Sequence, residues 1–235
     1  TTLFRSISEM ENKLAEFGYR MKFPMKSGDL SRRWCSAYLK IMVADTVLRN
    51  MNSVAANLTK TRMDIKLLIV SGERRGESVG RSKYNEIEIH RTNAVSKHHR
   101  TVHQWRPVID YSEKDIWEVL KRHKVNPHPC YRAGWNRCSC AMCIFSTPQL
   151  FAGIRELYPK EYALLCQDEK VLGFTLDNHC DLETYIGSAD SCVYHGDKEA
   201  IQSLLTGEFP VESVYVKDKW KYPVGAFHGA AGGPC

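Results

Sequence analysis

Four cysteines in one short stretch are the residues of this chain best suited to chemistry. The stretch runs from Pro127 to Phe145 and contains Cys130, Cys138, Cys140 and Cys143. The last three lie close enough in sequence for one tight loop to bring their thiols together. Thiolates grouped in this way suit zinc, an iron–sulfur cluster or dithiol redox chemistry. The alternative is that they are structural cysteines, and the pattern alone leaves these interpretations open.

A metal site at this loop needs a fourth ligand, and the sequence offers two candidates. One is Cys130, and the other is Cys35, which lies far upstream in the segment RRWCSAYLK. Arg33 and Lys40 flank Cys35, and nearby cations favour the reactive thiolate form of a cysteine. On the other interpretation, Cys35 is simply a small buried residue on a helix.

A second candidate site is a loop rich in arginine. It follows the apolar run from Lys66 to Ser71, which is typical of a buried parallel strand. Ligands bind at the ends of such strands, glycines let the backbone approach a phosphate, and arginines bind phosphate or sulfate oxygens. The alternative is a solvated polar turn. The candidate anion-binding residues of the loop are Gly72, Arg74, Arg75, Glu77, Ser78 and Arg81.

Arg106 and a group of histidines are weaker candidates. Arg106 precedes a proline, so its backbone is extended and its side chain could point into the same crevice. The alternative is a plain surface arginine. The histidines follow no metal-site spacing, which favours a solvated basic loop over a ligand set. They are His90, His98, His99 and His103.

The elements that must position these residues alternate between helices and strands. Ser6 begins a capping box for a first helix that Gly18 ends, and a second helical pattern runs from Ser31 to Arg49. Buried strands mixed with amphipathic helices favour an α/β layered fold with a mainly helical C-terminal third. Strands are predicted over 66–71 and 86–90 and ending near 105–110, and helices after Ser112, after Thr147, over 160–172 and over 197–205.

Bulk composition sets the class of protein. The chain has 235 residues, 43% of them hydrophobic, which is enough for a substantial core, and no apolar run approaches a membrane span. The N-terminal residues carry acidic groups where a signal peptide would be apolar, so we expect a cytoplasmic protein. Nine cysteines in a reducing compartment indicate metal or redox use rather than disulfides. The net charge of +6 favours anionic partners.

Four motifs in this order resemble the phosphoadenosine phosphosulfate (PAPS) reductase family. They are RRWCSAYLK, VSGERRGES followed by Arg81, HQWRPVIDYSEKDIWEVL and NPHPCYRAGWNRCSCAMCIF. The resemblance implies the adenine nucleotide alpha-hydrolase-like fold, a Rossmann-like parallel sheet with flanking helices. It places a nucleotide-binding α/β domain at residues 1–147, including the cysteine-rich loop 127–145. A helical region with a basic, glycine-rich tail then spans 148–235.

The resemblance also implies roles for the candidate residues. The arginine loop and Arg106 would line the site for the phosphates or sulfate of an adenine nucleotide, ATP or PAPS with Mg²⁺, and Arg33 and Lys40 are added to that set. Cys35, Cys140 and Cys143 match cysteines that relatives use for chemistry or for an iron–sulfur cluster. The implied metal ligands are Cys35, Cys138, Cys140 and Cys143, with Cys130 as an alternative ligand, for a cluster or zinc.

Two family features are missing from the sequence shown. The family's Ser-Gly-Gly-x-Asp-Ser phosphate loop is absent, so we expect a fold without its N-terminal phosphate-loop portion, or with that portion upstream of Thr1. PAPS reductases also carry a Glu-Cys-Gly-Leu-His segment near their end, whereas this chain ends in AAGGPC, with Cys235 as its last residue.

The missing Glu-Cys-Gly-Leu-His segment counts against sulfite-releasing PAPS or adenylylsulfate reduction. The leading hypothesis is therefore sulfur transfer by ATP pyrophosphatase chemistry, with DNA phosphorothioate modification as a candidate. A non-catalytic nucleotide-binding regulatory module is the third hypothesis. The expected partners are the nucleotide, a sulfur donor such as a cysteine desulfurase or thioredoxin, and DNA as a candidate acceptor. We expect no membrane association, and self-association into a homo-oligomer is compatible with the sequence.

Overall fold

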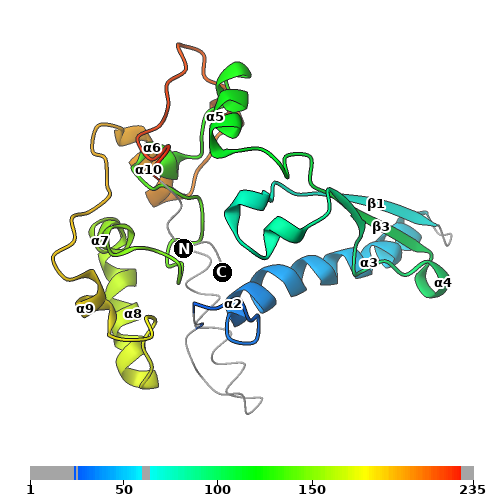
Figure 1. The fold of residues 1–235 in the computed structure, drawn as a ribbon, viewed down its shortest axis with the longest axis horizontal. Coiled ribbons are helices and arrows are strands. Elements are labelled where there is room, and N and C mark those ends of the chain that lie inside the picture. The colour runs from blue at the N-terminus through cyan, green and yellow to red at the C-terminus, as the bar shows by residue number, and fades with distance from the viewer. Residues whose placement is uncertain (1–23, 25, 60–63, 229–235) are drawn as a thin grey trace. The chain divides into compact units, whose positions relative to one another are not determined.

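The computed structural model describes residues 24, 26–59 and 64–228 (Figure 1). The predicted helix from Ser6 to Gly18 and the terminal Cys235 lie outside these residues. The described residues divide into two compact units. One is Asp29–Ser112, and the other runs from Glu113 to the end of the described chain. The domain boundary expected after residue 147 falls inside the second unit.

A long helical run opens the first unit. It begins with α2 (Trp34–Ser36), passes through a π-helical turn (Ala37–Ile41) and continues as α3 (Met42–Thr59). The helix predicted over 31–49 is therefore confirmed, and it continues ten residues further along the chain. Asp45 on α3 is buried and accepts two hydrogen bonds from the guanidinium of Arg91, at 2.9 and 2.7 Å. This ion pair fixes α3 to the segment that leads into the sheet.

The sheet of the first unit has three strands and is mixed. β1 (Ile65–Val70), β2 (Ile87–Ile89) and β3 (Arg100–Trp105) lie in the order β1-β3-β2. β1 pairs with β3 in parallel, and β2 pairs with β3 antiparallel. The two strands predicted near 66–71 and 86–90 are confirmed. The expectation of a buried strand at β1 is wrong, because its side chains alternate and Leu68 and Val70 are each 58% exposed.

The central strand, β3, was predicted only at its end, near Trp105. The rest of β3 lies in the segment expected to be a solvated basic loop, because the basic residues and histidines there show no apolar periodicity. Two features stabilise it as a strand: partners on both sides complete its backbone hydrogen bonds, and Arg100 is buried with its guanidinium donating to the carbonyls of Thr92 and Arg49 at 2.9–3.1 Å. A satisfied guanidinium can be buried where its charge alone would predict exposure.

The second unit is helical. The helices predicted after Thr147, over 160–172 and over 197–205 are confirmed. The side chains of Thr147 and Asp197 accept backbone N–H groups of the first helical turn, and Gly173 ends α8 with φ of 64°. No helix within the described residues is both long and apolar enough to cross a bilayer. The helices are α5 (Glu113–Arg122), α6 (Pro129–Arg132), α7 (Pro148–Leu157), α8 (Pro159–Leu172), α9 (Leu182–Ile186) and α10 (Lys198–Thr206).

The C-terminal segment packs against α5 although it forms little regular structure. Trp220 is 8% exposed, donates its indole N–H to the carbonyl of Val125 at 2.7 Å and joins Trp117 and Ala226 in a small core. The backbone also packs closely here, because a side chain at Gly225 would lie 1.9 Å from the carbonyl oxygen of Trp135. The glycine and the tryptophan of this segment therefore have packing roles.

Candidate functional site

The arginine loop leaves β1 and turns through two short 3-10 segments, Arg75–Glu77 and Arg81–Lys83. Glu77 is its organising residue. One carboxylate oxygen accepts from Arg74 at 3.3 Å, and the other accepts from Arg81 at 2.8 Å. Glu77 also accepts the backbone N–H of Arg74 at 3.3 Å, which closes the turn. The structure thus brings two of the predicted anion-binding arginines, Arg74 and Arg81, together around the carboxylate of Glu77.

Arg106 joins the arginine loop through its ion pairs. It is 3% exposed, so the alternative of a surface arginine is excluded. Its guanidinium donates to Glu73 at 2.6 Å and to Glu88 at 2.7 Å, and it lies over the ring of Tyr84 at 4.6 Å. Burial by itself would lower the pKa of Arg106, but the bonds to the two carboxylates raise it.

The charges of this region are balanced by carboxylates. Arg75 donates to Asp110 and, at 3.0 Å, to the carbonyl of Tyr84. The loop arginines and Arg106 are therefore paired in this structure, and an incoming anion must compete with a carboxylate for each guanidinium. Their side chains are held in place before any ligand arrives. Such a network can exchange carboxylate partners for the oxygens of a phosphate or sulfate.

The glycines of the loop have no structural requirement of their own. An added Cβ at Gly72 or Gly76 would meet no atom within 4 Å, and neither residue has a positive φ. The backbone here is therefore open to a close approach, as the sequence analysis proposed for phosphate binding. Ser78 donates no side-chain bond of its own but accepts the N–H of Arg81 at 3.2 Å.

The remaining candidates of the first unit are placed less tightly. Cys35 is half-buried in α2, Arg33 is half-buried beside it, and Lys40 is exposed on the π-helical turn. Among the histidines, His90 is buried and bonds the hydroxyl of Thr92 at 2.8 Å, with its pKa lowered chiefly by burial. The interpretation of His90 as part of a solvated loop is therefore wrong.

The cysteine-rich stretch forms a compact turn around α6. His128 accepts the backbone N–H of Cys130 through Nδ1 at 3.2 Å, and Pro129 occupies the first turn of the helix. Cys130 is buried, and the loop that follows α6 brings Cys138 close to it. The backbone N–H of Cys138 donates to the hydroxyl of Tyr131 at 3.1 Å. The ligand atoms of His128, Cys130 and Cys138 all lie within 4.8 Å of one another.

His128 is a residue that sequence reasoning missed. The available signal was its position two residues before Cys130, across a proline that begins a helical turn and keeps both side chains near one point. Cys140 and Cys143 are half-buried in the same unit as this group. Cys35 belongs to the other unit, so the set of Cys35, Cys138, Cys140 and Cys143 as iron–sulfur or zinc ligands stays a prediction.

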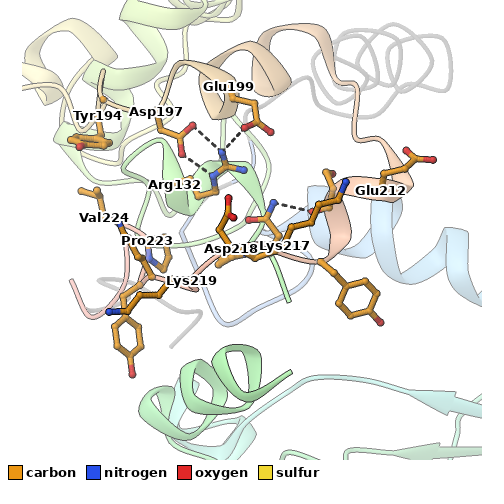
Figure 2. A pocket seen from close by; sticks show the side chains of 18 residues that line it. Arg132, Tyr194, Asp197, Glu199, Glu212, Lys217, Asp218, Lys219, Pro223 and Val224 are labelled. Atoms are coloured by element: carbon orange, nitrogen blue, oxygen red, sulfur yellow. Dashed lines mark hydrogen bonds and ion pairs between the residues drawn. The ribbon is translucent and has the colours of Figure 1, made fainter. Parts of the chain in front are cut away.

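An open pocket lies elsewhere in the second unit (Figure 2). Its volume is about 810 Å³, and at its wall Arg132 makes paired bonds to Asp197 at 2.8 and 2.9 Å and a third to Glu199 at 3.2 Å. Lys217 and Lys219 line it from the C-terminal segment, together with acidic Asp218 and Glu212, so its charge is mixed. The sequence analysis did not predict this pocket, because its walls come from segments far apart in the chain.

Comparison with known proteins identifies the relatives of this chain. Residues 11–146 match the family described as Phosphoadenosine phosphosulfate reductase domain. An "Uncharacterized 37.8 kDa protein in gpa 5'region" of Escherichia phage 186 is 30% identical over 71 residues, which is 30% of this chain and 21% of that protein. An adenosine 5'-phosphosulfate reductase of Burkholderia cepacia is 30% identical over 74 residues, or 32% of this chain and 27% of the reductase.

These matches cover little of the relatives' length. The aligned segments span about a fifth of the phage protein and about a quarter of the reductase. No solved structure matches the chain. The family match covers the arginine loop, Arg106 and the cysteine-rich stretch, whereas most of the residues that line the open pocket lie beyond it.

Proposed function

We propose that this chain, which belongs to the phosphoadenosine phosphosulfate reductase domain family, binds an adenine nucleotide at its arginine loop and acts in sulfur transfer. The observation that carries the proposal is the arginine network at the end of β1. Glu77 holds Arg74 and Arg81, and Arg106 is buried beside them. The proposal includes a Rossmann-like nucleotide site, since ligands of α/β sheets bind at strand ends.

The arginines would act by exchanging partners. The phosphates of a nucleotide together carry more charge than one carboxylate and accept more hydrogen bonds, so they can displace Glu77 from Arg74 and Arg81. The open backbone at Gly72 would allow the phosphate close to the chain. Arg106, buried with two carboxylates, would stay in place and keep Glu73 at the loop.

The proposed reaction is of the ATP pyrophosphatase type. An acceptor oxygen attacks the α-phosphorus of ATP, a new O–P bond forms, and pyrophosphate leaves with the electron pair of the broken P–O bond. The terminal sulfur of a cysteine persulfide, loaded by a sulfur donor, then displaces AMP from the activated acceptor. Cys140 and Cys143 are the proposed thiols for this step, with Cys35 as a further candidate. A second thiol releases the product by forming a disulfide, which an external thiol such as thioredoxin reduces.

The acceptor proposed from the sequence is a polyanion, with the DNA backbone as the candidate. The net charge of +6 supports an anionic partner in general but does not select among polyanions. The acceptor therefore has to be identified by assay, with pyrophosphate release as the readout for each acceptor supplied.

A second candidate function is reduction of adenylylsulfate or PAPS to sulfite. The match to the reductase of Burkholderia cepacia favours it. In this reaction a cysteine thiolate attacks the sulfur of the nucleotide, the adenosine phosphate leaves, and a second thiol releases sulfite with formation of a disulfide. The two candidates share the nucleotide site and differ in their products.

Nucleotide binding tests the shared part of both candidates. Titration calorimetry with ATP, adenylylsulfate and PAPS should show binding of at least one of them. Arg81→Gln should weaken it about 10- to 100-fold, because a hydrogen bond to a charged group contributes about 1.5–3 kcal/mol. Arg122→Gln, on α5 in the other unit, is the matched control and should leave it unchanged. Absence of binding to all three nucleotides would exclude both candidates.

Product analysis then separates the candidates. ATP–pyrophosphate exchange supports sulfur transfer, and sulfite release with thioredoxin supports reduction. Binding without either product indicates the third hypothesis, a non-catalytic nucleotide-binding module. The assays should use the chain both as given and extended by any residues that precede Thr1 in the natural protein.

A further inference from the structure

The cysteine-rich stretch contains a group of side chains that the proposed sulfur chemistry does not use. We propose that His128, Cys130 and Cys138 form a zinc site, separate from the thiols of Cys140 and Cys143. The observation behind it is the convergence of one imidazole and two thiols, whose ligand atoms lie within 4.8 Å of one another. Within the described part of the chain, this is the one group of three or more candidate ligands so placed.

The separation of these atoms is close to that of a bound zinc site. Tetrahedral zinc with Zn–S bonds of about 2.3 Å and Zn–N bonds of about 2.0–2.1 Å places neighbouring ligand atoms roughly 3.5–3.8 Å apart. Each pair of ligand atoms must therefore approach by about 1.0–1.3 Å at most. His128 and Cys138 are exposed and can rotate inward, while Cys130 is buried and acts as the fixed ligand.

Neighbouring groups hold the three ligands in place. The ring of His128 accepts the backbone N–H of Cys130 and lies 5.2 Å from the ring of Phe209. The backbone of Cys138 is held by the hydroxyl of Tyr131. Supporting contacts of this kind orient metal ligands before the metal binds.

A divalent cation also suits the charge of this group. It would deprotonate both thiols and remove the repulsion between the two neighbouring thiolates.

The ligand set favours zinc over an iron–sulfur cluster. Zinc accepts mixed nitrogen and sulfur ligands in tetrahedral sites, whereas most clusters are held by cysteine thiolates alone. Three protein ligands leave a fourth position for water or another exchangeable ligand. A zinc ion here would link the first turn of α6 to the loop at Cys138. It would also leave Cys140 and Cys143 free as the Cys-x-x-Cys pair of the proposed reaction.

The test is metal stoichiometry, which does not depend on nucleotide binding or turnover. The full chain is loaded with Zn²⁺, dialysed and analysed by mass spectrometry for zinc and iron. We expect one zinc per chain. His128→Gln and Cys138→Ser change exposed side chains, and each should weaken zinc binding by more than the 10- to 100-fold that is usual for changes outside the ligand set. Circular dichroism confirms that each variant is folded.

The matched control is the double variant Cys140→Ser/Cys143→Ser, which removes two thiols from the same loop and should keep its zinc. Cobalt substitution provides a second readout: the sulfur-to-cobalt charge-transfer band should fall by about half in Cys138→Ser and stay unchanged in the double variant. Zinc retained by both His128→Gln and Cys138→Ser would overturn the proposal. Zinc lost from the double variant, or less than one zinc per wild-type chain, would overturn it as well.

Discussion

Replacing Arg106 by Met should destabilise the first unit strongly, because it leaves two carboxylates without their buried partner. The side chain of Arg106 is 4% exposed, while those of Glu73 and Glu88 are 28% and 36% exposed. Removing one member of a fully buried ion pair costs about 3–5 kcal/mol. Because both carboxylates can be partly rehydrated, we expect about 2–3 kcal/mol here.

Arg75→Met is the control for this prediction. Arg75 also pairs with a carboxylate of the same unit, but its side chain is 34% exposed and that of Asp110 is 71% exposed. An exposed ion pair contributes about 0–1 kcal/mol, so Arg75→Met should lower the free energy of unfolding by less than about 1 kcal/mol. The two variants therefore remove the same charge and differ mainly in the burial of the pair.

Urea unfolding measures the difference. With a slope of about 2 kcal/mol/M, the midpoint should fall by about 1–1.5 M for Arg106→Met and by less than about 0.5 M for Arg75→Met. Hydrogen exchange of peptides from residues 65–105 reports on this unit separately from the helical one. Adding Glu88→Gln should recover part of the loss, since the unpaired carboxylate is then removed. Equal midpoints for the two arginine variants would refute the reasoning.

Three further predictions concern glycines, the α3 ion pair and the C-terminal segment. Gly72→Ala should change the free energy of unfolding by less than about 1 kcal/mol yet weaken nucleotide binding in calorimetry. Gly134→Ala should lower the free energy of unfolding by at least about 2 kcal/mol, because Gly134 has a φ of 108° and the new Cβ would lie 1.9 Å from a backbone carbonyl oxygen. Loss of stability in both variants would contradict this prediction. The hydrogen bond from Arg91 lowers the pKa of Asp45, so its stabilisation is present above the unfolded pKa of about 3.9 and is lost as the pH falls through the lower folded pKa. Asp45→Asn should therefore cost about 1–3 kcal/mol at pH 7 and progressively less below pH 4, in urea titrations at each pH; a cost independent of pH would count against the pair. Trp220→Ala should lower stability by about 3–5 kcal/mol, and a thermal melt unchanged from wild type would show that the C-terminal segment does not pack as described.

Local signals predicted most of the helices correctly. Thr147 and Asp197 cap the helices that follow them, and Gly173 ends α8, because a cap depends on a few adjacent residues and their backbone bonds. The strand at 65–70 was also visible, since a short apolar run ending in Ser-Gly carries its own signal. The exposure of one face of this strand could not be predicted, because burial depends on which other elements cover that face.

Non-local pairing explains the failures. β3 has no apolar pattern, and it is a strand because β1 and β2 bond to both of its edges and because carbonyls distant in sequence satisfy Arg100. The burial of Arg106 has the same origin. The proline that follows Arg106 predicts an extended backbone, but only the fold decides that Glu73 and Glu88 pair with its buried guanidinium.

The sequence by itself determined which residue types are available and which family the chain resembles. It identified the arginine loop after β1 and the cysteine-rich stretch, because both are contiguous and carry unusual residues at close spacing. Only the tertiary structure decided how these residues are grouped. It pairs the arginines with carboxylates, and it places Cys138 beside Cys130 and His128. The reason is that a side chain interacts with whatever lies near it in space. Spacing along the chain limits where a residue can lie but does not determine its neighbours.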